Sequence, residues 1–199
     1  MTAVITGDII DSQRGQVDSW MEPLKRVLNA YGDTPKDWEI YRGDSFQLKV
    51  DVKTALLAAI HLKAAIKQTK VHDLRMAIGL GEESYSSARV SESNGSAFVH
   101  SGECFDSLKK KKLAIKSPRS AVDEPLNIMI QLALLTMDDW SQVVSTVIKT
   151  AIENPEKTQS EWAQLLDRSQ SNISEALSRG GYEEIMKMND YYIKAFCPS

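Results

Sequence analysis

The order of strand-like and helix-like segments in the first 81 residues constrains the fold of this 199-residue chain more than any other feature. Short runs of β-branched and apolar residues, or strict alternation, indicate strands, whereas apolar residues three and four apart indicate helices. These patterns predict, in order, a strand at 2–6, a helix at 18–30, strands at 38–41 and 45–50, a helix at 53–68 and a strand at 74–81. The two middle strands meet at Gly43-Asp44, so we expect them to form a hairpin.

This β-α-β-β-α-β order is that of the ferredoxin-like arrangement, and it predicts an α+β domain. After a polar stretch, a helix is expected at 97–108 and a late strand at 112–116. Ser117-Pro118-Arg119-Ser120 has the composition of a linker. We therefore expect the first domain to cover residues 1–117.

Residues 121–199 have helical patterns and predict a second, all-helical domain. Its first helix is apolar on nearly every side from Leu126 to Leu135, so we expect it to be buried between other elements. A second helix places apolar residues three and four apart from Trp140 to Ala151. It is expected to end at Asn154-Pro155, because the residue before a proline disfavours the helical conformation.

Residues 158–181 have the pattern of a helix-turn-helix. Thr158 and Glu161 are spaced as a capping box, which begins a helix whose apolar face is Trp162, Leu165 and Leu166. The second helix is expected from Gln170 to Ser178, and Gly180-Gly181 ends it. The alternative is an ordinary helical hairpin that packs its apolar face on the preceding helices.

The outward residues of the second helix are short and polar, which favours DNA binding. Asn and Gln side chains can bond adenine edges, and Arg can bond guanine or phosphate. The stretch 158–177 also resembles the helix-turn-helix of many bacterial regulators, in which an alanine such as Ala163 packs under the second helix. We assign contacts with double-stranded DNA to Arg168, Gln170, Ser171, Asn172 and Arg179.

Two aspartates in the first domain, Asp8 and Asp44, follow strand-like segments. If the first and third strands lie side by side, both carboxylates reach one end of the sheet. Mg²⁺ usually binds one or two carboxylates together with phosphate oxygens and water. The alternatives are ordinary turn chemistry for Asp44 and a local side chain–backbone bond for Asp8, with Asp11 or Ser12 in its place.

The layout of residues 3–108 resembles the nucleotidyl cyclase and GGDEF superfamily. In that group an Asp at the first strand and a Gly-Asp hairpin bind metal, and the residue after the first Asp lends a carbonyl. The resemblance implies Mg²⁺ or Mn²⁺ at Asp8, Ile9 and Asp44, and a nucleotide near Gly7, Asp11, Ser12 and Gly43. With its C-terminal helix-turn-helix, the whole chain resembles the SatD-like family of bacterial proteins.

Three departures from the superfamily favour nucleotide binding over turnover. Ile40 stands where class III cyclases have a purine-selecting Lys, and Ser45 stands where GGDEF enzymes have Glu. The helix after Gly95 lacks the Asn-x-x-x-Arg pair that stabilises the cyclase transition state. Cyclisation needs charge stabilisation at the transferring phosphate as well as metal. A lysine run at 109–112 could contact phosphate, although such a run is more often a solvated face.

Composition narrows the remaining possibilities. The longest apolar run, 126–137, is shorter than the roughly 20 residues needed to span a bilayer, and the start lacks a signal-peptide pattern, so we expect a cytoplasmic protein. Two cysteines and three separated histidines indicate neither a disulfide framework nor a zinc site. The net charge of −3 argues against non-specific coating of nucleic acid.

Three hypotheses follow. The first is a DNA-binding transcriptional regulator whose N-terminal domain senses a nucleotide or metal. The second is a metal-dependent nucleotidyl-transfer enzyme whose helices serve dimerisation, and the third is a non-enzymatic interaction protein on a cyclase-like scaffold. We expect a homodimer, because cyclase-like domains and helix-turn-helix proteins both commonly pair.

Overall fold

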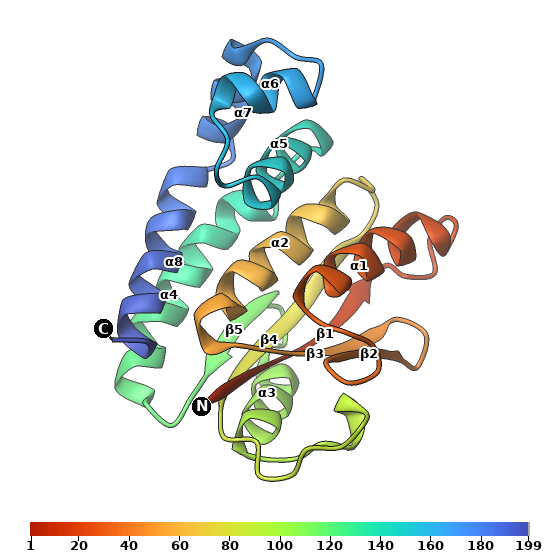
Figure 1. Cartoon of the computed structure of the whole chain (residues 1–199), viewed down its shortest axis with the longest axis vertical. Coiled ribbons are helices and arrows are strands. Elements are labelled where there is room, and N and C mark those ends of the chain that lie inside the picture. Colours follow the sequence, from red (N-terminus) through yellow and green to blue (C-terminus); the bar gives the residue numbers. More distant parts are fainter. Residues whose placement is uncertain (199) are drawn as a thin grey trace.

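The computed structural model describes residues 1–198, and over this range the protein is an α+β fold with one mixed five-stranded sheet and eight α-helices (Figure 1). Every strand expected from the sequence is present. The strands are β1 (Thr2–Ile10), β2 (Trp38–Tyr41), β3 (Ser45–Val50), β4 (Asp73–Gly81) and β5 (Leu113–Lys116). Their order in the sheet is β2-β3-β1-β4-β5, with all neighbours antiparallel except β4 and β5.

Strand β1 is longer than expected, because the chain does not turn at Gly7. Gly7 lies inside the strand and pairs with Phe46 of β3 and Met76 of β4. A Cβ atom at position 7 would lie 2.6 Å from the Phe46 ring. The glycine is therefore required by close packing rather than by a turn, and Asp8 is a strand residue.

The sheet is covered on both faces, which follows from the alternation of side chains along a strand. Ala3, Ile5 and Ile9 of β1 belong to the main core, together with helices α1 (Asp18–Tyr31) and α2 (Ala55–Lys67). Val4 belongs to a separate apolar cluster with residues of α3 (Ser96–Ser107). Helix α3 packs close to β4, since a Cβ atom at Gly79 would lie 2.3 Å from the Ala97 carbonyl oxygen.

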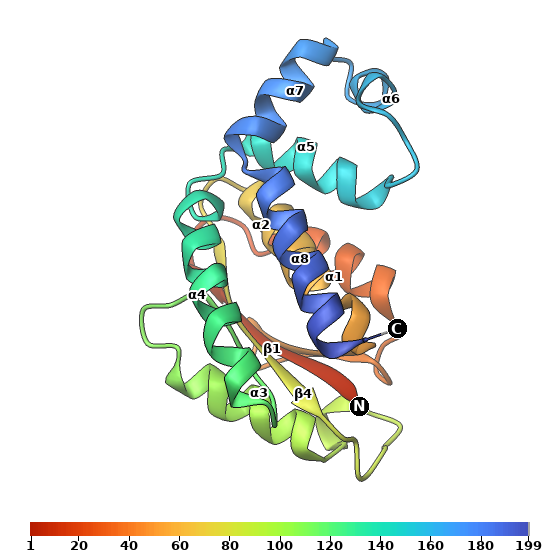
Figure 2. The same cartoon turned by 90° about the vertical axis from the view of Figure 1, so that its left-hand side faces the viewer.

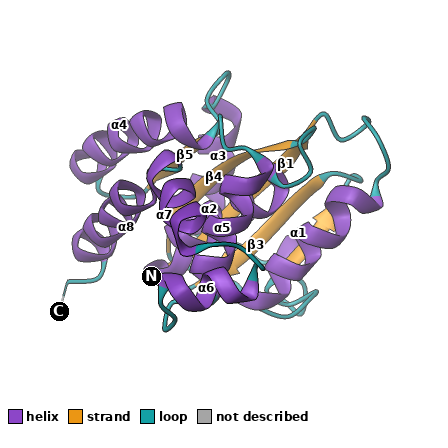
Figure 3. Ribbon diagram, turned by 90° about the horizontal axis from the view of Figure 1, so that it is seen from above, coloured by secondary structure: helices purple, strands orange, loops and turns teal. Residues whose placement is uncertain are grey.

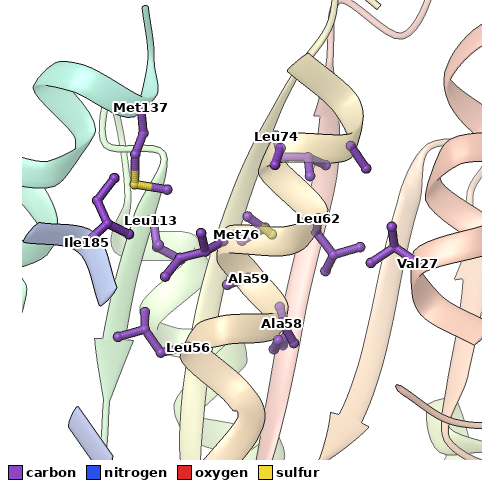
Figure 4. Packing of buried hydrophobic residues seen from close by; sticks show 14 of the residues in the cluster. Val27, Leu56, Ala58, Ala59, Leu62, Leu74, Met76, Leu113, Met137 and Ile185 are labelled. Carbon is purple, nitrogen blue, oxygen red and sulfur yellow. The ribbon is translucent and has the colours of Figure 1, made fainter. Parts of the chain in front are cut away.

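The remaining helices are α4 (Ser120–Met137), α5 (Gln142–Glu153), α6 (Gln159–Leu165), α7 (Gln170–Arg179) and α8 (Tyr182–Phe196). Helix α8 has no counterpart in the sequence interpretation above. The buried core continues from the sheet into these helices, as Figure 4 shows for Leu62, Met137 and Ile185. The Tyr192 hydroxyl of α8 donates a 2.5 Å hydrogen bond to the Val52 carbonyl next to α2.

The expectation that α4 is buried on nearly every side is wrong. Leu126, Ile130 and Leu134 are buried, but Ile128, Leu132 and Leu135 are 57%, 61% and 72% exposed. Helix α4 lies at the edge of the molecule beside α8, and Figure 2 shows that side turned toward the viewer. One apolar face of α4 therefore has no cover from the described chain.

Across residues 1–198, none of the helices has the length and apolar character needed to cross a membrane.

Candidate functional site

The two aspartates predicted to bind metal lie at the same end of the sheet. Asp8 of β1 is directly opposite Ser45 of β3, so Asp44 is one residue away across the strand pair. The Ile9 N–H donates a 3.1 Å hydrogen bond to the Asp44 carbonyl oxygen. Gly43 beside it has a φ of 90°, which suits a glycine in the hairpin turn.

The Asp8 carboxylate is bound by an arginine. Arg75 lies opposite Asp8 on β4 and contacts both carboxylate oxygens, Nη2 to Oδ2 at 2.6 Å and Nε to Oδ1 at 3.3 Å. Its guanidinium also lies over the Phe105 ring of α3, 4.7 Å from the centroid. The hydrogen bonds to Asp8 raise the pKa of Arg75 further above its ordinary value. Such a two-point pair fixes the geometry of both side chains.

The Asp44 carboxylate has a different partner. The Ser12 hydroxyl donates a 2.6 Å hydrogen bond to Asp44 Oδ2. Ser12 is itself buried, and its carbonyl accepts a 3.3 Å bond from the Trp20 indole of α1. Asp11 next to it is exposed, with a φ of 61° and a 3.5 Å contact with Arg14. The loop after β1 thus connects the hairpin to the start of α1.

Sequence reasoning missed Arg75, because the pairing of β1 with β4 was not part of the prediction. The observed antiparallel register of these two strands places Arg75 opposite Asp8, on the same face of the sheet. Tyr41 is a second neighbour of Asp8. Burial raises the pKa of Tyr41, and the Asp8 charge adds to this effect against the opposing charge of Arg42.

The donor types at this end of the sheet suit a hard divalent cation, since Mg²⁺ prefers carboxylate and carbonyl oxygens. No three Asp, Glu, His or Cys side chains of residues 1–198 converge on one point, so Asp8 and Asp44 would be supplemented by the Ile9 carbonyl, phosphate or water. The Arg75 guanidinium already lies against Asp8. A metal at Asp8 would therefore compete with Arg75.

The lysine run lies at the same end of the sheet as the two aspartates. Strand β5 is parallel to β4 and begins beside Met76, whose N–H donates a 2.9 Å bond to the Lys112 carbonyl. Lys109, Lys110 and Lys111 are exposed, whereas the Lys112 ammonium binds Asp73 at 2.9 Å. Three exposed lysines and the two half-buried carboxylates thus occur at the same end of the sheet.

Helices α6 and α7 are joined by a short turn, and the cap of α6 is the one that the sequence predicts. Thr158 and Glu161 form a complete capping box at the start of α6. The Ser169 hydroxyl accepts a 3.3 Å bond from the Asn172 N–H at the start of α7. Figures 1 and 2 show the two helices at the opposite end of the molecule from α3, resting on α5 and α8.

The inward and outward faces of this pair differ sharply. Trp162, Ala163, Ile173, Ala176 and Leu177 are buried. The five residues assigned to DNA contacts are all exposed: Arg168, Gln170, Ser171, Asn172 and Arg179. One expectation is wrong, because Leu165 is 55% exposed rather than part of the apolar face. Leu165 is the last residue of α6, beside the turn that leads to α7.

Acidic residues surround the pair, and several are already bound. Glu161 is held by its capping-box bonds to Thr158, whose N–H and hydroxyl lie 2.8 Å from the carboxylate. Glu175 on α7 contacts Arg179 at 3.6 Å, and both side chains are exposed. When no DNA is bound, Arg179 is therefore paired with Glu175.

Comparison of the chain with protein-family models, with curated protein sequences and with solved structures found no match.

Proposed function

We propose that this protein is a DNA-binding transcriptional regulator whose sheet domain binds a nucleotide together with Mg²⁺ or Mn²⁺. The observation that carries the proposal is the exposed polar start of α7, at Gln170, Ser171 and Asn172. A recognition helix presents its N-terminal residues to base edges in the major groove. The projecting position of α6 and α7 gives a duplex access to this surface (Figure 2).

The class of fold supports the nucleotide part of the proposal. We interpret β2-β3-β1-β4 as a ferredoxin-like sheet to which β5 is added, because its order and antiparallel pairing match that arrangement. The resemblance to nucleotidyl cyclases places nucleotide contacts at Gly7, Asp11, Ser12 and Gly43, and metal at Asp8, Ile9 and Asp44. A SatD-like bacterial protein of this architecture would be cytoplasmic.

DNA binding is tested by a gel shift with DNA from the protein's own promoter region, repeated over a series of salt concentrations. Asn172→Ala should weaken binding to a specific site by about 1–3 kcal/mol, the usual contribution of a good base contact. Asn29→Ala changes the same residue type at an exposed position of α1 and should have no effect. Absence of a shift at low salt with tens of micromolar protein, which is weaker than ordinary non-specific binding, would refute the assignment.

Arg179 is expected to act on phosphate rather than on bases. Its replacement by Ala should weaken all sequences alike and flatten the salt dependence. Because Arg179 also contacts Glu175, Glu175→Gln should strengthen non-specific binding slightly. If Arg179→Ala changed the sequence preference instead, the docking orientation would be wrong.

Nucleotide binding is tested by thermal shift with Mg²⁺ or Mn²⁺ and ATP or GTP, since a ligand of the native state raises its apparent stability. Asp8→Asn or Asp44→Asn should remove the shift, and Asp33→Asn, an exposed aspartate on another loop, should retain it. If the double variant bound metal-nucleotide as tightly as wild type, the pocket would lie elsewhere.

The second candidate is a metal-dependent nucleotidyl-transfer enzyme, favoured by the shared position of Asp8 and Asp44 at one end of the sheet. Formation of a new product from ATP or GTP with Mn²⁺, lost in Asp44→Asn, would favour this candidate.

A further inference from the structure

One side of α4 and α8 exposes large apolar side chains, and we infer that a second copy of this chain packs on it. Figures 1 and 3 show the two helices side by side at one edge of the molecule, and the chain runs along them in opposite directions. Ile128, Leu132 and Leu135 of α4 and Tyr191 of α8 are large apolar side chains that are more than 40% exposed. We call this surface the α4–α8 face.

The composition of this face is that of an interface centre rather than of a solvated helix. Residues 127–137 contain no charged residue, in a chain that is 26% charged. Depletion of charge at the centre is what distinguishes protein interfaces from the remaining surface. The structure places three of the apolar side chains four and three residues apart, at 128, 132 and 135, so they form one continuous ridge.

A groove lies beside the ridge, and in a dimer it would receive the ridge of the second copy. A groove of about 620 Å³ lies between α4 and α8, and its lining includes Met129, Ala133, Met188 and Tyr191. A twofold rotation brings the ridge of one copy against the groove of the other, and repeats the contact in the opposite sense. Such a self-complementary patch is the requirement for a closed, isologous dimer.

The charges at the rim also permit self-pairing. Lys111 and Glu124 border the α4 side of the face, and Glu184 and Lys187 border the α8 side. Because each border carries both signs, a twofold-related copy can present a carboxylate to each ammonium group. A different protein whose contact surface carried charges of one sign would be repelled by the residue of like charge on each border.

The size of the face is adequate for a dimer. The 18 residues of α4 give a length of about 27 Å, and two adjacent helices give a width of about 20 Å. This is a flat footprint on the order of 500 Å², and its ridged surface has a larger accessible area. A stable interface buries roughly 800 Å² per partner, so a dimer contact here would have to bury the whole of this ridged face.

The inference is tested by light scattering coupled to gel filtration on the full chain at tens of micromolar. Wild type should elute with twice the chain mass of 22.2 kDa. Leu132→Glu should weaken the dimer by about 100-fold or more, because each dimer carries the substitution twice and each 1.4 kcal/mol is a factor of ten. Val99→Glu is the matched control, since Val99 is 50% exposed on α3, and it should remain dimeric.

Several outcomes would overturn the inference. They are a monomeric wild type, a dimeric Leu132→Glu variant with an unchanged melting temperature, or native mass spectrometry showing a monomer that retains a small apolar molecule. Since Leu132 is exposed in one chain, the variant should fold, and circular dichroism checks this. The result is independent of DNA binding, because Leu132→Glu can be monomeric while the α7 surface still binds single half-sites.

Discussion

Replacement of Lys63 by Met should destabilise the protein substantially, because this lysine is a fully buried charge with two carboxylate partners. Lys63 on α2 is 0% exposed. Its ammonium lies 2.8 Å from Asp73 Oδ1 at the start of β4 and 2.6 Å from Asp138 Oδ1 at the end of α4. Methionine keeps the length of the side chain and removes the charge, so both carboxylates lose one of the cations that they share.

The expected loss can be estimated from what remains. Removal of one partner of a buried ion pair costs about 3–5 kcal/mol, because an uncompensated charge is left behind. Lys112 still contacts Asp73 at 2.9 Å and Asp138 at 3.1 Å, so the loss should be at the lower end, about 3 kcal/mol. For a chain of this size the melting temperature should then fall by roughly 6–12 °C.

The pH dependence provides a second, independent readout. Burial alone would raise the pKa of Asp73, but the charge and hydrogen bond of Lys63, with further bonds from Lys112 and the Leu74 N–H, lower it below the ordinary 3.8. The stability that this depressed pKa contributes is present above the ordinary value and is lost as pH falls through the folded pKa. Wild type and Lys63→Met should therefore differ most at neutral pH and converge below about pH 4.

Urea unfolding followed by circular dichroism from pH 3 to pH 8 measures both effects. The control is Lys110→Met, which removes an exposed lysine in the turn before β5. Its free energy of unfolding should stay within about 0.5 kcal/mol of wild type. If Lys63→Met were as stable as wild type at pH 7, the site would repack as an apolar core, as some buried ion pairs do. A gap that widened toward pH 3 would also contradict the reasoning.

Two further predictions concern positions outside this cluster. Gly7→Ala should lower the free energy of unfolding by about 1–3 kcal/mol, because the added Cβ would overlap the Phe46 ring. Gly102→Ala on α3 is the control, since its Cβ meets no atom within 4 Å and the change should be neutral or stabilising. Denaturant melts of both variants check this. The hydrogen bond from His61 lowers the Glu153 pKa from 4.5 to about 2; burial opposes this shift and Lys149 adds to it. Because the Glu153 side chain is about one-third exposed, Glu153→Gln should cost only about 1 kcal/mol at pH 7. That contribution is present above pH 4.5 and lost as pH falls toward 2, so equal stability of the two proteins at pH 7 would contradict it.

The strands and most helices could be predicted because their local patterns agree with their final surroundings. Phe46, Leu48 and Val50 alternate in sequence and point into the same core. Residues 121–199 were expected to be helical as a whole, and the spacing of Ile185, Met188 and Tyr192 is the local signal for α8, to which no separate helix was assigned. The extent of β1 could not be predicted, since a glycine after a short strand is typical of a turn, whereas Gly7 makes room for the ring of Phe46, 39 residues away.

The site shows the same division between local and distant causes. The hairpin and its Gly43-Asp44 turn follow from neighbouring residues, and the pairing of β1 with β3 then brings Asp8 to the same end of the sheet. The partners of the two carboxylates depend on tertiary contacts. Ser12 bonds Asp44 through its hydroxyl and accepts a bond from the Trp20 indole of α1 through its carbonyl. The uncovered face of α4 was unpredictable for a related reason, since an apolar sequence does not say whether its cover comes from the same chain.

A continuous core joins the two parts to which the proposed function assigns different ligands. Helix α5 packs on α2 and supports α6 and α7. His61 of α2 lies 3.2 Å from the Tyr31 hydroxyl of α1 and 3.3 Å from the Glu153 carboxylate of α5, so one side chain connects three helices. The loop that binds Asp44 through Ser12 leads directly into α1.

The position of α7 is thus set by packed helices and not by a free linker. If metal-nucleotide binding moves Ser12 and the start of α1, the displacement can reach α5 through the Tyr31–His61–Glu153 contacts. The nucleotide then changes the affinity for DNA by some coupling factor. Thermodynamic reciprocity requires that DNA change the affinity for the nucleotide by that same factor. Tyr31→Phe, which removes one bond to His61 and leaves both ligand surfaces intact, should reduce that factor without changing either affinity measured alone.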